Sequence, residues 1–127
     1  MKYLLFLCQI LTVLCFCSCR TPEKTIRERS FEINDIFGHK ASVTFKEDGS
    51  FNGFSGVNRF FGQYKLDGSR ISFNGMGSTK MAGPPDAMRF EDKFMKSFSQ
   101  ADRCTFIGNS FTLYKGGIPL ITLKAVE

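Results

Sequence analysis

Apolar and polar residues alternate in several short segments of the chain, and this alternation is typical of β-strands with one exposed face. The alternating segments are residues 42–45, 51–54, 70–73, 104–107, 111–113 and 120–124. Short turns with glycine separate many of them, including Glu47-Asp48-Gly49, Asp67-Gly68-Ser69, Gly108-Asn109 and Gly116-Gly117. Because such short turns join antiparallel neighbours, the pattern predicts a meander of antiparallel strands.

Residues 63–73 give the most specific local signal. Two strand-like halves flank a turn in which Gly68 supplies the positive φ that a tight hairpin requires. The aromatic-rich run before this hairpin is interrupted by Gly53, Gly56 and Gly62. Glycines within strands usually mark bulges, bends or a close approach of the backbone, and we expect one of these features here.

One segment has helical spacing instead. Its apolar stripe consists of Ala87, Phe90, Phe94 and Phe98. Asp86 is the expected N-cap, and Glu91 and Asp92 lie in the early turns, where acidic residues favour the helix dipole. The pattern predicts an amphipathic helix of about four turns. We expect its phenylalanine stripe to pack on the core; the alternative is a docking face for a partner.

These elements predict a mainly β fold, borderline with the α+β class. The expected architecture is a small, antiparallel, strongly bent sheet with one helix over a face or opening. The chain has fifteen phenylalanines and no tryptophan, and the thirteen phenylalanines from Phe31 to Phe111 are expected to supply the core.

The first residues predict an export signal. Lys2 precedes an almost uninterrupted apolar run from Tyr3 to Phe16, which is shorter than a membrane-spanning helix requires. The run ends in Phe16-Cys17-Ser18-Cys19, which resembles the lipobox of bacterial lipoproteins. We therefore predict a signal peptide at residues 1–18, lipidation of Cys19, a tether at residues 19–29 and a domain at residues 30–127. Secretion without lipidation is the alternative.

This leader predicts the location and the membrane partner. The expected place is the cell envelope, with the lipid in the outer membrane and the domain on its periplasmic side. Glu23 is the only early acidic residue of the tether, and an acidic run that would direct surface display is missing.

The leader also decides what the five cysteines can do. Cys8, Cys15 and Cys17 leave with the signal peptide and Cys19 carries the lipid, so only Cys104 remains. We therefore expect no intramolecular disulfide, no cysteine metal site and a buried, inert thiol.

Length and charge limit the partners further. About 109 residues follow the leader, which is enough for one compact domain, expected as a monomer. The whole chain has 17 basic and 12 acidic residues, a mild excess without a basic cluster. Together with the export signal, this argues against a nucleic-acid partner.

Residues 56–84 carry a family resemblance. The motifs Asn-Arg-Phe-Phe-Gly-x-Tyr at residues 58–64 and Ser-Thr-Lys-Met at residues 78–81 resemble the META domain of bacterial HslJ-like proteins. The resemblance implies a cracked, partly open β-barrel with a helix. Many family members have two cysteines where this chain has Val57 and Gly83, and their joint absence implies that the two loops lie side by side.

Candidate chemistry is sparse. His39 is the only histidine and we expect it in an exposed loop, without the second ligand or triad partner that zinc or nucleophilic chemistry needs. The serines lack a nucleophile-elbow motif, and Gly75 and Gly77 lack the rest of a phosphate loop. We therefore predict no catalytic residues and no cofactor.

The candidate binding loop comprises Asn58, Arg59, Ser78, Thr79 and Lys80, which converge if the family arrangement holds. In one interpretation, Asn58 and Thr79 satisfy backbone groups of the loops while Arg59 and Lys80 stay solvated. In the other, the two cations and nearby amides form a subsite for an anion or carboxylate.

The sequence as a whole predicts a non-enzymatic, lipid-anchored envelope protein that serves as a binding or stress-response accessory module. The link to stress is implied by the resemblance alone. A first alternative is a carrier of an apolar ligand, such as a lipid tail, in a barrel lined by Phe45, Phe51, Phe73 and Phe111. A second is a docking protein or inhibitor of another envelope protein. An enzyme would require a pocket with a pair of perturbed titratable groups.

Overall fold

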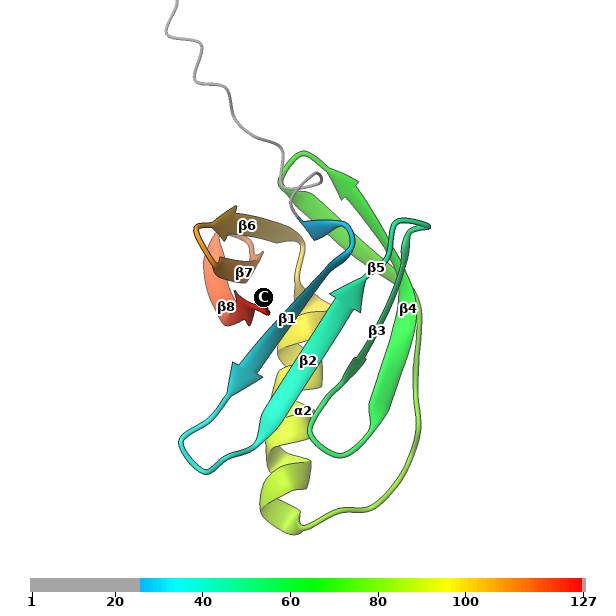
Figure 1. The fold of residues 1–127 in the computed structure, drawn as a ribbon, viewed down its shortest axis with the longest axis vertical. Coiled ribbons are helices and arrows are strands. Elements are labelled where there is room, and N and C mark those ends of the chain that lie inside the picture. The colour runs from blue at the N-terminus through cyan, green and yellow to red at the C-terminus, as the bar shows by residue number, and fades with distance from the viewer. Residues whose placement is uncertain (1–25, 127) are drawn as a thin grey trace, which may run out of the picture.

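The structure is a computed structural model, and it describes residues 26–126. The predicted signal peptide, Cys19 and most of the predicted tether lie outside this range. Within it the chain forms strands and one helix in the following order (Figure 1): β1 (Arg29–Asn34), β2 (Lys40–Phe45), β3 (Ser50–Phe54), β4 (Arg59–Asp67), β5 (Arg70–Ser78), α2 (Pro85–Gln100), β6 (Arg103–Ile107), β7 (Ser110–Lys115) and β8 (Ile118–Ala125).

The strands form a closed antiparallel barrel in sequence order from β1 to β8. Two neighbouring pairs of strands share only a short stretch of pairing. β5 pairs with β6 only through Arg70 and Arg103, and β1 pairs with β8 through Phe31–Ala125 and Glu32–Lys124. The helix α2 connects β5 to β6 and lies behind β1 and β2 in Figure 1. The predicted mainly β, antiparallel barrel with one helix is confirmed, and its shortest strand pairings are at these two junctions.

The predicted strand segments all lie within observed strands. The hairpin at Gly68 is confirmed, with Asp67 paired to Arg70 across the turn and a φ of +61° at Gly68. The prediction did not include β1. Its inward-facing Phe31 is fully buried, and Ile26, which precedes the strand, is buried as well. The packed domain thus extends further toward the N-terminus than the expected boundary at residue 30.

The helix begins differently from the prediction. Its N-cap is Pro84, and no side chain caps it, so the expectation that Asp86 is the N-cap was wrong. The two prolines explain this start, because proline is favoured in the first turn, where its missing N–H has no partner to lose. Asp86 lies in that first turn and is free to bond elsewhere.

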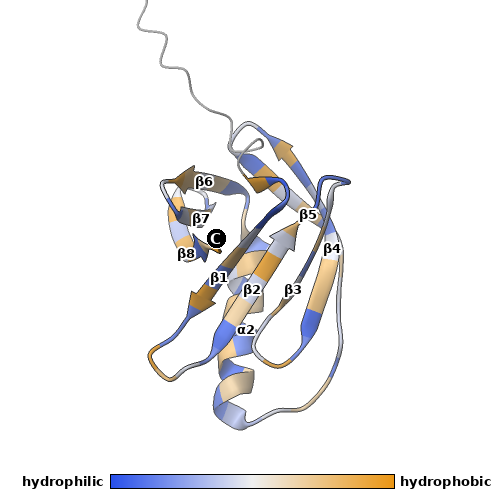
Figure 2. Cartoon of the chain, viewed as in Figure 1, coloured by the Kyte–Doolittle hydropathy of each residue, from blue (hydrophilic) through white to orange (hydrophobic). Residues whose placement is uncertain are grey.

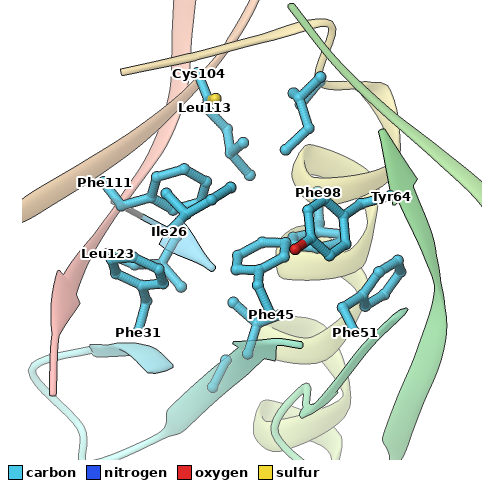
Figure 3. Close-up of a cluster of buried hydrophobic side chains, with 14 of the residues drawn as sticks. Ile26, Phe31, Phe45, Phe51, Tyr64, Phe98, Cys104, Phe111, Leu113 and Leu123 are labelled. Carbon is cyan, nitrogen blue, oxygen red and sulfur yellow. The ribbon is translucent and has the colours of Figure 1, made fainter. Parts of the chain in front are cut away.

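Phenylalanine side chains from the sheet and the helix fill the barrel (Figure 3). Phe98 of α2 stacks on Phe73 of β5 at 4.3 Å between ring centroids and contacts Phe51 and Phe60 at 5.5 and 5.2 Å. Phe94 and Phe98 are 3% and 0% exposed. Phe94 and Phe98 of the apolar stripe are therefore part of the core, as predicted, whereas Phe90 of the same stripe is only partly buried.

The four rings proposed to line a lipid-carrying barrel pack on one another instead. Phe45 contacts Phe51 and Phe111 at 6.3 and 5.6 Å between centroids, and Phe51 contacts Phe73 at 5.3 Å. The rings themselves occupy the space between the four residues, so an acyl chain has no room there.

Gly62 shows why the aromatic run needs glycine. A Cβ at this position would lie 2.7 Å from Cζ of Phe51 and 3.0 Å from the carbonyl oxygen of Asn74. The register between β4 and β5 shifts at the same place, between Phe61 and Gln63. The predicted bulge and close approach are therefore both present.

No helix between residues 26 and 126 has the length and hydropathy required to cross a membrane.

Candidate functional site

The two loops that carry the family motifs, at residues 55–59 and 78–83, meet around the side chain of Asn58. We call them the signature loops. Its Nδ2 donates to the Met81 carbonyl at 3.1 Å and to Glu91 Oε2 at 2.8 Å, while its Oδ1 accepts from Thr79 Oγ1 at 3.0 Å and from the Met81 amide at 2.6 Å. An asparagine amide has two donors and room for two acceptor bonds, so the whole capacity of Asn58 is used. The side chain is 5% exposed and cannot bind a ligand without giving up a bond to the protein.

Thr79 has an equally structural position. Its hydroxyl accepts a hydrogen bond from the Arg59 amide at 3.1 Å, and its own amide donates to the Arg59 carbonyl at 2.9 Å. The structure thus brings Asn58 and Thr79 together in the way the structural interpretation of the loops requires.

The other three residues of the candidate binding loop point to solvent. Arg59, Ser78 and Lys80 are exposed. Their side chains form no hydrogen bond or ion pair within the part of the chain that the structure describes. The anion subsite proposed for Arg59 and Lys80 stays a prediction.

Glu91 of α2 binds the loop at residues 55–58 through its carboxylate. Its Oε1 accepts from the Ser55 hydroxyl at 2.5 Å, the Asn58 amide at 2.6 Å and the Val57 amide at 3.2 Å. Glu91 is 6% exposed and Ser55 1%. Glu91 was expected only to favour the helix dipole, and its contact with the loop was not predicted. The signal was present, since residues 87, 91, 94 and 98 are the buried face of the helix and a glutamate among them needs partners.

The ionisation of Glu91 depends on these donors. Burial alone raises the pKa of a carboxyl group, but the hydrogen bonds from Ser55, Asn58 and Val57 outweigh it and lower the pKa of Glu91 below its ordinary value. The group is therefore a buried carboxylate at neutral pH, which joins the helix to both loops.

The two loops touch although both cysteines are absent. A Cβ placed on Gly83 would lie 3.5 Å from Cβ of Val57 and 2.8 and 3.0 Å from its two γ-carbons. A disulfide joins Cβ atoms that are about 3.5 to 4.5 Å apart. The implied proximity of the two positions is thus present in this chain, where Val57 fills the space instead of a bridge.

A groove lies on a different part of the surface, beside α2. We call it the α2 groove. Its volume is about 480 Å³, within the usual range for ligand sites. Its lining comes from the β1–β2 segment, one face of α2 and β8, namely Ile33, Asp35, Phe37, His39, Asp86, Arg89, Phe90, Lys93, Phe94, Ser97, Leu120 and Ile121.

His39 is a lining residue of the α2 groove with three close partners. Its Nδ1 lies 2.7 Å from Asp35 Oδ2 and its Nε2 lies 3.0 Å from Asp86 Oδ2, while the ring stacks on Phe90 at 5.5 Å between centroids. The predicted loop position is confirmed, since His39 lies between β1 and β2, but the expected exposure was wrong, because the side chain is only 17% exposed. The hydrogen bond to Asp35 is the main cause that raises the pKa of His39, with a further contribution from Asp86. His39 thus links the β1–β2 turn to the first turn of α2.

Arg89 and Lys93 supply the cationic charge of the α2 groove. They are four residues apart on α2, hence neighbours on one helix face, and both are exposed. Neither has an ion-pair partner among the described residues.

The remaining reactive groups are less available. Burial raises the pKa of the Cys104 thiol to about 12, so it stays protonated and inert in the core. Within residues 26–126, His, Cys, Asp and Glu side chains form no group of three that could hold a metal ion.

Solved structures share this fold. An NMR structure of a protein from Burkholderia xenovorans superimposes with a TM-score of 0.64 at 19% sequence identity, covering 83% of this chain and 86% of that one. A second NMR structure gives a TM-score of 0.59 at 22% identity, covering 82% of this chain and 93% of that one. At these identities the likeness concerns the fold alone.

The sequence comparisons agree with the fold and with the two signature loops. No curated protein matches the chain. A family model described as META domain matches residues 24–127, which include every strand, the helix and both loops. The chain belongs to the META domain family.

Proposed function

We propose that this chain is a non-enzymatic, lipid-anchored protein of the cell envelope whose META domain binds a ligand in the α2 groove. The attachment rests on the export signal at residues 1–18 and on the lipobox-like sequence that ends in Cys19. The binding role rests on one observation above all, which is a groove of ligand size lined by both apolar and charged side chains.

The walls of the α2 groove are held by the core. On the helix side, Phe94 and Phe98 pack inside the barrel and Glu91 bonds to the 55–58 loop. On the other side, β8 is paired along its length with β7. A site between such elements keeps its shape without a ligand, which lowers the cost of ordering on binding.

The side chains at the α2 groove favour binding over catalysis. A general base needs a free nitrogen or oxygen directed at the substrate. In His39 both ring nitrogens are engaged by carboxylates. The geometry of these contacts supports a role in holding the β1–β2 turn against the first turn of α2. The link to stress responses rests on the family resemblance and stays a prediction.

The proposal is tested by what the protein carries from its native envelope. The lipidated protein and a Ser97→Trp variant are purified in parallel, and the bound small molecules are identified by mass spectrometry. Ser97 lines the groove and is only partly buried, so a larger side chain there fills the groove without entering the core. We expect a stoichiometric small molecule on the native protein and its loss from Ser97→Trp. A molecule retained equally by both would place the binding site elsewhere.

The attachment is tested separately. Cys19→Ala is expected to release the protein from the membrane fraction, whereas Cys104→Ala leaves it there. Membrane retention of Cys19→Ala would contradict the lipid anchor.

A further inference from the structure

We infer that the α2 groove takes an amphipathic anion, with an apolar body on the groove floor and its anionic head at Arg89 and Lys93. This inference rests on the proposed binding function and specifies its ligand class. It uses the apolar lining, the two unpaired cations and the state of the two nearby carboxylates.

The apolar part of the ligand is indicated by the lining. Phe90, Phe94, Leu120 and Ile121 line the groove from opposite walls. At its edge, Phe37 is 79% exposed and the adjacent Ile36 is 92% exposed. Figure 2 shows this apolar tip on the turn between β1 and β2. Exposed aromatic surface beside a groove gains most from an apolar ligand that covers it.

The head group is indicated by the charges that have no partner. Arg89 and Lys93 line the groove one helical turn apart and form no ion pair with any residue from 26 to 126. Arginine donates in a planar fork and lysine as a point charge, so the two together suit an oxyanion.

The two carboxylates of the α2 groove, unlike the two cations, already have hydrogen-bond partners within the protein. Asp35 Oδ1 accepts from the amides of Phe37 and His39 at 2.9 and 2.8 Å, and its Oδ2 bonds to the His39 ring. Asp86 bonds to the other ring nitrogen. Because His39 partly compensates both acids, the charges left to attract a ligand are the two cations, and the groove should prefer an anion to a cation of equal size.

The experiment compares three photoreactive ligands of the same chain length on the full-length protein in its native membranes. Decanoate, decanol and decyltrimethylammonium, each with a terminal diazirine, are titrated below membrane-disrupting concentrations. After irradiation, labelled peptides are mapped, and half-saturating concentrations are read from the peptides that contain residues 89–97 and 118–121. We expect decanoate to label these peptides at a concentration about tenfold lower than decanol, and decyltrimethylammonium to be weakest.

Variants assign the preference to the two cations. Arg89→Ala with Lys93→Ala should raise the half-saturating concentration of decanoate about tenfold and leave that of decanol unchanged. Lys65→Ala with Lys96→Ala is the matched control, because it removes two exposed cations that do not line the groove. It should have no effect. Ser97→Trp should reduce labelling by all three ligands.

The outcomes separate the inference from the proposed function. If the groove peptides are labelled equally by decanoate and decanol, or preferentially by the cation, the groove binds ligands but the anion inference is overturned. An equal loss in the control variant would attribute the preference to net charge and also overturn it. If none of the three ligands labels the groove peptides above the rest of the chain, both the inference and the proposed binding site fail.

Discussion

The contact between Val57 and Gly83 makes a quantitative prediction about a disulfide. Val57→Cys together with Gly83→Cys places two Cβ atoms about 3.5 Å apart, inside the range that disulfides adopt. The close contacts that a Cβ at residue 83 would make are with the γ-carbons of Val57 at 2.8 and 3.0 Å, and the first substitution removes both carbons. The bridge should therefore form without a shift of the backbone.

The gain in stability follows from the length of chain that the bridge closes. The two positions are about 26 residues apart, for which the chain-entropy relation gives about 12 cal/mol/K lost by the unfolded state. At 25 °C this corresponds to an increase of about 3.5 kcal/mol in the free energy of unfolding. Any strain at the new bridge would lower the measured value.

Urea unfolding of one protein in two redox states measures this increase. Because the chain has no tryptophan, unfolding is followed by far-UV circular dichroism, and the double variant is compared before and after reduction. The Cys104 thiol, with its pKa raised to about 12, does not compete for the new cysteines. Gly83→Cys alone is the control and should be less stable than the parent, since Val57 still occupies the space. Failure of the two cysteines to join, or equal stability of both redox states, would refute the loop contact.

Four further predictions concern Glu91, His39 and Phe98. Glu91→Gln should lower the free energy of unfolding by about 2 to 3 kcal/mol, because an amide cannot accept from all four donors. The control Asp92→Asn, at an exposed position, should change little, and equal effects of both variants in a urea titration would contradict the role of Glu91. The lowered pKa of Glu91 means that its contribution is complete above pH of about 4.5 and is lost as pH falls through the folded pKa, so parent and Glu91→Gln should converge in acid. His39 is the only histidine, so its NMR titration is unambiguous, and we expect a midpoint above pH 6.5. The contribution of His39 to stability should be present below pH 6.5 and lost as pH rises through the folded pKa. A midpoint at or below pH 6.5 would contradict the contacts with Asp35 and Asp86. Phe98→Ala should cost about 3 to 5 kcal/mol and the half-exposed Phe61→Ala much less, and comparable losses in thermal unfolding would argue against the packing of α2 in the barrel.

The family signature and the α2 groove have separate roles in this structure. Thr79 forms its hydrogen bonds with Arg59 and Asn58, within the two loops. Asn58 also bonds to Glu91, and this contact fixes the start of β4 against the helix. The α2 groove is lined by none of the signature residues. A motif that identifies the family therefore points to what maintains the fold, and the ligand site proposed here depends on residues outside it.

Much of the fold could be predicted because its information is local. The alternation in residues 42–45 and 104–107, the turn at Gly68 and the spacing of Phe94 and Phe98 each depend on residues close in sequence. The strand β1 was missed although Phe31 and Ile33 alternate with polar neighbours, because the polar segment before it was assigned to a tether.

The candidate site could be predicted only in part. Asn58 and Thr79 were expected to meet on the strength of the family resemblance, and they do. The role of Glu91 and the position of His39 were not predicted. Glu91 is 33 residues from Asn58 in sequence, and His39 is 47 residues from Asp86. The pattern of residues close in sequence cannot predict a hydrogen bond between residues that are this far apart in the chain.

The sequence by itself determined most of the strands, the tight hairpin and the apolar side of the helix, because periodicity dictates which side chains share a face of an element. The tertiary structure decided which elements closed the barrel, where Glu91 and His39 found their partners, and that a groove opened beside α2. These features depend on how the helix, which connects β5 to β6 in the chain, packs against β7 and β8, and packing between distant elements is set by the shapes of both surfaces together. The charge of Arg89 and Lys93 was visible in the sequence, but only the fold places these cations in one groove with apolar side chains from β1 and β8.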